Sequence, residues 1–186
     1  MTRMVVLVAI AAAWLAAQVP SPEAWSQADT ATRRLPPSEF STLPNAVRTA
    51  LDRRGCTIPQ VYTGGQPHNV VRGAFRRAGQ VDVAILCSRA RTSAILVFWA
   101  GDPHNIEEIA ARPDADFLQV VALDRIGFSR AIGVESPAYM RERSRRYGGP
   151  LPPSLAHDGI NDAFVEKASV VWYWHEGRWL QLAGAD

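Results

Sequence analysis

Hydrophobic residues are most concentrated between positions 79 and 102, where two apolar runs are separated by the short polar sequence Arg89-Ala90-Arg91. In the first run apolar side chains recur at every second position, which is the spacing of a β-strand. The residues that share one face of this run are Val81, Val83, Ile85 and Cys87. The second run, positions 92–100, is apolar almost throughout, as in a strand that is covered on both sides. The pattern predicts a buried β-hairpin at the centre of the fold.

A second hairpin is predicted between positions 165 and 182, with Glu176-Gly177 as its two-residue turn. This turn pairs Trp174 with Trp179 across the two strands. Alternation then gives one face the residues Ala168, Val170, Trp172, Trp174 and Trp179. We expect this face to enter the core. The alternative is that Trp172, Trp174 and Trp179 form an exposed aromatic strip that binds carbohydrate or peptide.

Three stretches carry helix signals. The apolar stripe of the first, at positions 43–54, consists of Leu43, Val47, Ala50 and Leu51. That of the second, at positions 103–113, consists of Ile106, Ile109 and Ala110. The third runs from Pro137 to about position 147, and each of the three is preceded by a residue that can cap its first turn: Thr42, Asp102 and Ser136.

Further strands are predicted at positions 69–75, 117–123 and 128–134, with a turn at positions 124–127 between the last two. The sequence GGPLPPS at positions 148–154 is incompatible with regular structure, because it contains two glycines and three prolines. These strands and the two hairpins predict a mainly antiparallel sheet.

The first 28 residues have the pattern of a secretory signal peptide, because a short basic start leads into the apolar run at positions 4–17. This run is shorter than the ~20 apolar residues of a membrane-spanning helix. Cleavage after Ala17 or after Ala28 satisfies the small-residue rule, and neither site is followed by a cysteine that could carry a lipid. Positions 18–37 are rich in proline, serine and alanine, so we expect residues 29–38 to be a disordered lead-in and residues 39–186 to be a single folded domain.

Two cysteines, Cys56 and Cys87, in a chain with an export signal predict one disulfide bond. The alternative is a reactive thiol at Cys87. The apolar neighbours of Cys87 argue against it, because they raise the pKa of a thiol.

The net charge is only +2, and 19 of the 20 basic residues are arginine, since Lys167 is the single lysine. Four arginines fall in the third predicted helix: Arg141, Arg143, Arg145 and Arg146. They form either a solvated helix face or a binding site for phosphate or an acidic envelope polymer. No aromatic residues are interleaved for base stacking, so nucleic acid is not an expected partner.

The densest polar cluster is His157-Asp158-Gly159-Ile160-Asn161-Asp162. Its residues are ordinary turn and cap residues, but His157 and Asp158 are also candidate acid/base groups. Asp158, Asn161 and Asp162 are candidate metal ligands, although they lack the spacing of a calcium loop. The remaining histidines lack the spacing of zinc ligands, so we expect no metal and no cofactor.

Residues 69–86, NVVRGAFRRAGQVDVAIL, resemble one FG-GAP or VCBS unit. The residues that match its pattern are Gly73, Phe75, Gly79, Asp82 and Ala84. Residues 74 and 76–78 are alanine or arginine where this family has acidic calcium ligands, so the resemblance implies a hairpin without a calcium site. The whole chain also resembles small exported bacterial proteins of unassigned function, which implies a compartment and no activity.

The sequence therefore predicts an exported, periplasmic or secreted α+β domain with two or three helices packed on one face of its sheet. No Gly-x-Ser-x-Gly, phosphate-binding loop, Cys-x-x-Cys or Ser-x-x-Lys motif is present. We expect a non-enzymatic binding or interaction module for an envelope protein or polymer, with no membrane anchor after signal cleavage. The alternatives are a small envelope hydrolase that uses His157 and Asp158, and a metal-stabilised structural protein.

Overall fold

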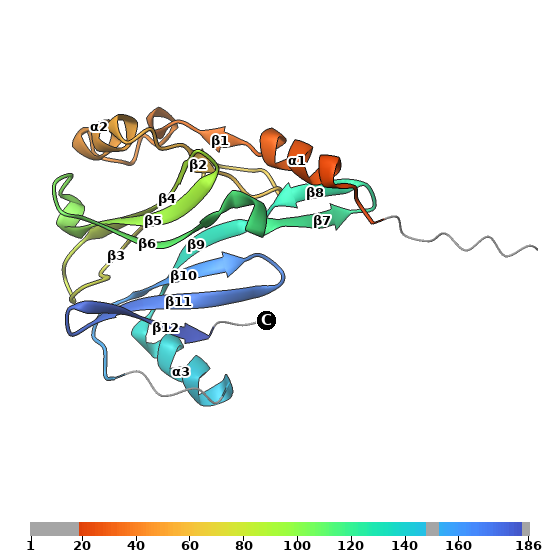
Figure 1. Cartoon of the computed structure of the whole chain (residues 1–186). Helices are drawn as coiled ribbons and strands as arrows, with labels where there is room; N and C mark the ends of the chain where they lie inside the picture. Colours follow the sequence, from red (N-terminus) through yellow and green to blue (C-terminus); the bar gives the residue numbers. More distant parts are fainter. Residues whose placement is uncertain (1–18, 148–152, 184–186) are drawn as a thin grey trace, which may run out of the picture.

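The computed structural model describes residues 19–147 and 153–183, which form a single small α+β domain that consists mainly of antiparallel sheet. Two four-stranded sheets pack against each other, and helices lie outside them (Figure 1). The region predicted to lack regular structure, positions 148–154, lies mostly outside the described residues, as do both the apolar run of the leader and its cleavage site after Ala17. Among the described residues, no helix is long and apolar enough to cross a membrane.

The first sheet contains the predicted central hairpin. Its strands, in spatial order, are β3 (Val70–Gly73), β4 (Asp82–Arg89), β5 (Thr92–Phe98) and β6 (Ile106–Pro113). Ala90 and Arg91 both have positive φ, as the tight turn between β4 and β5 requires. Both faces of β4 and β5 are buried, so the prediction of a covered hairpin is confirmed. Val81 precedes β4 and is exposed, so its predicted place on the buried face is wrong.

The predicted helix at positions 103–113 is wrong, because this stretch is the edge strand β6. Its residues Ile106 and Ile109 pair with Phe98 and Ile95 of β5. A separation of three positions puts them on opposite faces of the strand, where Ile106 joins one hydrophobic core and Ile109 another. A strand between two cores therefore has the same apolar spacing as the face of a short helix.

The second sheet consists, in spatial order, of β12 (Arg178–Ala183), β11 (Ala168–His175), β10 (Gly159–Phe164) and β9 (Arg130–Glu135). The predicted pairing of Trp174 with Trp179 is confirmed. Strand β10 was not predicted, because its polar residues are typical of a turn. The structure accommodates them: a Cβ atom at Gly159 would lie 2.7 Å from the sulfur of Met140, and Asp162 pairs with the buried Arg130.

A separate two-stranded ribbon is formed by β7 (Leu118–Ala122) and β8 (Arg125–Phe128). The predicted turn at positions 124–127 is thus mostly strand, and the next predicted strand is divided between β8 and β9. Gly127 suggested a turn, but its lack of a side chain serves packing: a Cβ atom there would lie 2.4 Å from the Cβ atom of Tyr62.

Two of the three predicted helices are present, at α2 (Asn45–Arg53) and α3 (Pro137–Tyr147). Val47 and Leu51 of α2 pack on the outer face of the first sheet. Met140 of α3 packs on the outer face of the second sheet, against Val171 and Tyr173. The helices therefore cover opposite sides of the two sheets, and the expectation that they share one face is wrong (Figure 1).

A third helix, α1 (Pro22–Ala31), extends from the predicted signal peptide into the lead-in at positions 29–38. A short strand at Arg34–Leu35 and a 3-10 turn at Pro37–Glu39 follow it, so the prediction of a disordered lead-in is wrong. The Ser21 hydroxyl caps its first turn by accepting a hydrogen bond from the backbone N–H of Ala24. Trp25 and Ala28 pack against the core between the two sheets. The composition of this segment suggested disorder, but its N-terminal cap and two core contacts hold it in a helix.

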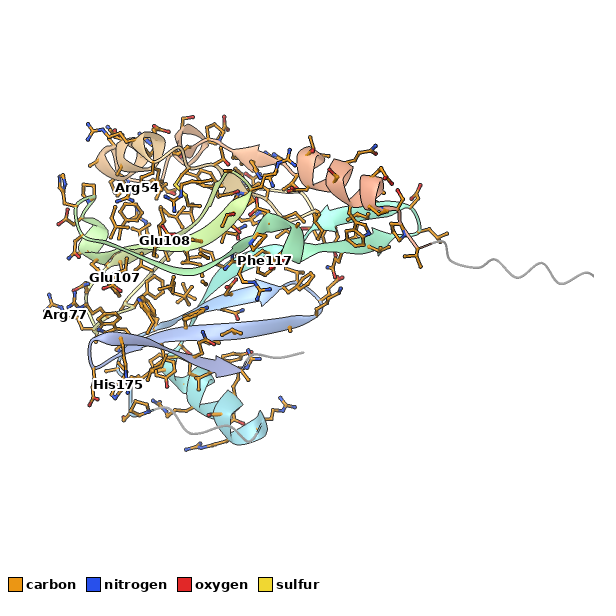
Figure 2. The ribbon with its side chains drawn as sticks, viewed as in Figure 1. Arg54, Arg77, Glu107, Glu108, Phe117 and His175 are labelled. Atoms are coloured by element: carbon orange, nitrogen blue, oxygen red, sulfur yellow. A yellow bond between two sulfur atoms is a disulfide. The ribbon has the colours of Figure 1, made fainter. Side chains whose placement is uncertain are left out.

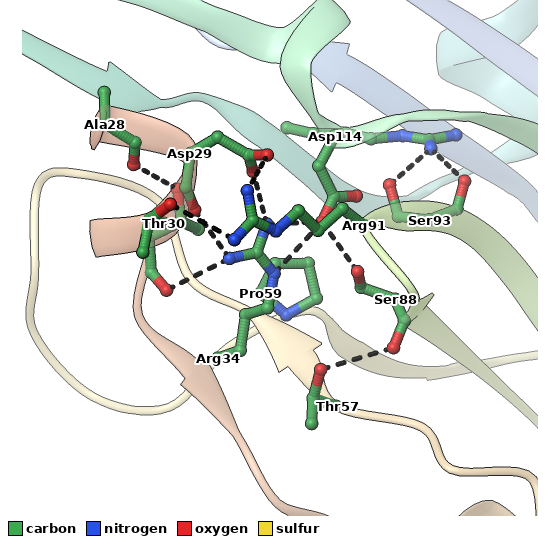
Figure 3. A network of polar contacts seen from close by, with 12 residues as sticks. Ala28, Asp29, Thr30, Arg34, Thr57, Pro59, Ser88, Arg91, Ser93 and Asp114 are labelled. Atoms are coloured by element: carbon green, nitrogen blue, oxygen red, sulfur yellow. Dashed lines mark hydrogen bonds and ion pairs between the residues drawn. The ribbon is translucent and has the colours of Figure 1, made fainter. Parts of the chain in front are cut away.

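A network of charges around two buried carboxylates, Asp29 and Asp114, fixes the end of α1 to the first sheet (Figure 3). Arg34, in β1 (Arg34–Leu35), forms ion pairs of 2.7 Å with both Asp29 and Asp114. Asp114 also accepts a 2.6 Å hydrogen bond from the Ser88 hydroxyl, and Arg91 pairs with Asp29 at 3.1 Å. Burial alone would lower the pKa of Arg34, but its bonds to the two carboxylates outweigh burial and raise it. The second predicted cleavage site, after Ala28, would cut α1 immediately before Asp29.

The predicted disulfide between Cys56 and Cys87 is present. Strand β2 (Ile58–Pro59), which pairs with β1, begins two residues after Cys56. Both cysteines are buried in the core under α2. The bond therefore ties the segment that follows α2 to the middle of β4.

Candidate ligand-binding site

Three tryptophans meet at one end of the space between the sheets. Trp99 lies in the short 3-10 turn η2 (Trp99–Gly101) after β5, while Trp174 and Trp179 face each other on β11 and β12. The Trp99 ring centroid is 5.2 Å from that of Trp174 and 5.5 Å from that of Trp179. The predicted tryptophan face does enter the core, because Trp172, Trp174 and Trp179 all pack against the residues between the sheets.

An exposed arginine covers the outer side of this cluster. The guanidinium carbon of Arg76 lies 5.4 Å from the ring centroids of both Trp99 and Trp174, within the range of a cation–π interaction. The Arg76 side chain forms no hydrogen bond or ion pair with another residue in the described part of the chain. The described part of the chain therefore leaves the N–H groups of this exposed guanidinium, stacked on two tryptophan rings, without an acceptor.

The loop that carries Arg76 is held by one buried carboxylate. Asp82, at the start of β4, accepts hydrogen bonds from the backbone N–H groups of Phe75 and Arg76 and from that of Ala100, next to Trp99. A single side chain thus sets the position of the arginine relative to the tryptophan. Asp82 is fully buried, so this geometry belongs to the folded core.

An open cleft of about 440 Å³ adjoins the Arg76 guanidinium. Its walls are Arg76, Arg77, Ser154, Leu155, Ala156, His157, Trp174, His175, Glu176 and Gly177. We call it the arginine–tryptophan cleft. Figure 2 shows Arg77 and His175 at the same end of the two sheets, where β11 turns into β12. The walls of the cleft contain two arginines and two histidines but one carboxylate, that of Glu176, so the cleft favours an anionic ligand.

The predicted pair His157 and Asp158 is divided by the fold. His157 lines the cleft, and its Nδ1 lies 3.1 Å from the backbone oxygen of Asp158. The Asp158 carboxylate accepts a 2.9 Å hydrogen bond from the backbone N–H of Ala74, and its own N–H donates to the Ala74 oxygen at 2.8 Å. Asp158 therefore joins the second sheet to the loop after β3 and does not line the cleft.

The three candidate metal ligands also have separate roles. Asp162 forms a two-bond ion pair with Arg130, and Asp158 binds the backbone of Ala74. Asn161 is next to Asp162 on β10, so its side chain lies on the other face of that strand. Within residues 19–147 and 153–183, no group of three or more histidine, cysteine, aspartate or glutamate side chains is placed to hold a metal ion.

The four arginines of α3 do not reach the arginine–tryptophan cleft. Arg143 is buried against the Tyr139 ring, and Arg141 donates to the backbone oxygen of Leu155. Burial raises the pKa of the nearby Glu135, while the charge of Arg143 acts to lower it. Only Arg145 and Arg146 are exposed, so the predicted polyanion surface is reduced to two residues at the end of the helix.

Arg76, which lines the cleft, and Trp99, whose ring lies under the Arg76 guanidinium, were not among the predicted site residues. In the sequence, Arg76 is an arginine where a calcium site would have an acidic ligand, and Trp99 is one apolar residue within a predicted strand. Their sequence separation of 23 positions gives no local signal. One sequence feature could have identified Arg76 as a site residue: it is a cation in place of an acidic residue, in the loop between Gly73 and Gly79.

Comparison of the chain with protein-family models, with curated proteins and with solved structures finds no match. The chemistry of the site is therefore the basis for assigning a function.

Proposed function

We propose that this protein is a non-enzymatic, exported binding module that holds a carboxylate or phosphate group of its ligand in the arginine–tryptophan cleft. The observation that carries this proposal is the Arg76 guanidinium, which is exposed, lies over two tryptophan rings and has no carboxylate partner within residues 19–147 and 153–183. A planar guanidinium matches carboxylate and phosphate geometry with two parallel hydrogen bonds. Stacking on Trp99 and Trp174 reduces the conformational entropy that the arginine side chain loses on binding.

The aromatic wall selects the part of the ligand next to its anionic group. Trp174 lines the cleft together with Leu155 and Ala156, so a ring or short apolar segment packs there while the anion meets Arg76 and Arg77. An acidic sugar of an envelope polymer has both parts. The hydrolase alternative receives no support from the geometry, because Asp158 is bound to Ala74 and does not face the cleft.

We expect Arg76→Gln to weaken the binding of oligogalacturonate, an acidic sugar probe, about tenfold or more. A hydrogen-bonded charge contributes about 1.5–3 kcal/mol, and 1.4 kcal/mol corresponds to a tenfold change in the dissociation constant. Isothermal titration calorimetry at two salt concentrations measures the change. Arg54→Gln is the matched control, since it removes the same charge at the end of α2 (Figure 2).

An equal loss in both variants would mean that only net charge matters, and the proposed cleft would be wrong. The same holds if oligogalacturonate and inorganic polyphosphate both fail to bind the unaltered protein. Neither side chain forms a hydrogen bond or ion pair with another described residue, so we expect Arg54→Gln to keep the melting temperature of the parent protein and Arg76→Gln to lower it only by the small cation–π contribution.

Export is the second part of the proposal, and α1 makes a specific prediction about it. We expect the mature protein to begin at Gln18, because cleavage after Ala28 would remove the packing of Trp25 and Ala28. Intact mass measurement of the exported protein tests this. A chain of residues 29–186 should melt at a lower temperature than one of residues 18–186, since burying a large apolar side chain contributes on the order of 1–3 kcal/mol. A mature protein that begins at Asp29 would contradict the prediction.

A further inference from the structure

A second cleft, of about 370 Å³, lies at the other end of strand β11. Its walls are Ala110, Arg112, Phe117, Asp162, Phe164, Ala168, Ser169, Val170, Trp172 and Gln181. The amino end of β11 contributes to this cleft, and its carboxyl end contributes to the arginine–tryptophan cleft. Phe117, from the 3-10 turn η3 (Asp114–Phe117), stands beside the cleft between the two sheets (Figure 2). We call it the phenylalanine cleft.

Aromatic rings form its apolar walls and are held in place. The ring centroids of Phe117 and Phe164 are 5.7 Å apart in an edge-to-face arrangement. The guanidinium carbon of the buried Arg130 lies 4.4 Å from the centroid of the Phe117 ring. Trp172 supplies a third wall. Aromatic faces carry partial negative charge and attract C–H groups with partial positive charge. The cleft is therefore preformed for a flat apolar surface.

The charge within the cleft is balanced. Asp162 accepts hydrogen bonds of 2.8 and 2.7 Å from Arg130, so together the two groups carry no net charge. Arg130 uses its remaining donors on the backbone oxygens of Ser93 and Ala110 and on the Ser93 hydroxyl, and has none left for a ligand. Arg112 at the rim is neutralised in the same way, because it pairs with Asp116 at 2.8 Å. Neither Asp162 nor Arg112 is therefore an unpaired charge, and the cleft favours a neutral ligand.

Polar groups nevertheless remain for a ligand to bind. The Asp162 side chain is 10% exposed, and each of its oxygens, bonded once to Arg130, keeps a second lone pair. Gln181 pairs with Trp172 across β11 and β12 and so shares its face, and its amide has no hydrogen-bond partner among the described residues. The indole N–H of Trp172 is buried without a hydrogen-bond partner among the described residues, although such groups ordinarily have one.

From these observations we infer that the phenylalanine cleft binds a neutral sugar ring. A pyranose has a C–H face for the aromatic walls and hydroxyl groups at its edge that both donate and accept hydrogen bonds. Its hydroxyls match the acceptor Asp162 and the amide of Gln181. A wholly apolar ligand would leave these polar groups without partners. The volume is within the range of small-molecule sites, about 300–1,000 Å³. This site is separate from the anion site proposed above.

The test is titration of the purified protein with cellobiose, maltose and chitobiose, in which binding is measured by calorimetry and by tryptophan fluorescence. We expect saturable millimolar binding of at least one sugar, and a change in fluorescence because Trp172 lines the cleft. Gln181→Ala should weaken that binding about two- to tenfold, the range for loss of one hydrogen bond. Gln66→Ala is the matched control, on an exposed loop outside the cleft, and Arg76→Gln should leave sugar binding unchanged.

Absence of binding of all three sugars at about 10 mM, a concentration that would reveal a millimolar dissociation constant, would overturn the inference. An equal effect of Gln66→Ala and Gln181→Ala would also overturn it. Melting temperatures of the variants establish that they remain folded. Because the anion site is tested with a different probe and a different arginine, either proposal can fail without the other.

Discussion

Replacement of Arg130 by methionine is expected to lower the free energy of unfolding by about 3–5 kcal/mol, the usual cost of leaving one member of a buried ion pair without its partner. Arg130 is fully buried and reaches from β9 in the second sheet to Ser93 and Ala110 in the first. Its loss would leave the Asp162 carboxylate uncompensated and would deprive backbone oxygens of both residues in the first sheet of a donor. Urea unfolding followed by tryptophan fluorescence measures the change.

A second variant separates the charge from the packing. Arg130→Met combined with Asp162→Leu removes the unpaired carboxylate, so we expect the double variant to be more stable than Arg130→Met alone. Arg125→Met is the control, since Arg125 is an exposed residue of the neighbouring strand β8. A loss for Arg130→Met as small as that for Arg125→Met would contradict the role assigned to this ion pair.

Removal of the disulfide is the other change with a large expected effect. The bond joins residues 31 positions apart, and the chain-entropy model gives a loss of roughly 3–4 kcal/mol for a loop of this size. Cys56→Ala with Cys87→Ala should therefore lower the melting temperature strongly. The double variant is the direct test, because both sulfurs are buried and a reductant reaches them only after the protein opens.

Reductant supplies the internal control for this prediction. It should lower the melting temperature of the parent protein toward that of the double variant and leave the double variant unchanged. If the double variant melted at the parent temperature, the bond would contribute nothing to stability. Its role would then be restricted to folding kinetics.

The two hairpins could be predicted because each is specified by residues close together in sequence. Glu176-Gly177 sets both the turn and the register, so the pairing of Trp174 with Trp179 follows from a two-residue loop. The disulfide could also be predicted, since the chain contains only two cysteines. Local turn chemistry and simple counting were sufficient for these features.

The errors occur where a residue's role depends on a distant partner. The apolar spacing of β6 reflects two cores on opposite faces of one strand, which a single sequence cannot distinguish from a helical stripe. The polar residues of β10 become compatible with a strand only because Arg130, from β9, neutralises Asp162. Tertiary contacts override local propensity in both cases.

The candidate site was predicted only in part for the same reason. Trp174 and His157 were identified and do line one cleft. Arg76 and Trp99, which give that cleft its charge and its platform, come from two loops that the buried Asp82 holds together. Three backbone hydrogen bonds to one carboxylate leave no periodic pattern in the sequence, so this arrangement becomes visible only in the folded chain.

Strand β11 contributes to both clefts, with residues 174 and 175 at one and residues 168–170 and 172 at the other. Both outer faces of the sandwich are covered by helices, and Trp172 and Trp174 pack into the core, so the terminal residues Ala168 and His175 are the places on this strand where side chains can change without disturbing a core. Substitutions that far apart generally have additive effects on stability. The domain could thus acquire a new ligand preference at one cleft while the other is retained, which makes β11 the expected location of sequence variation among proteins that share this fold.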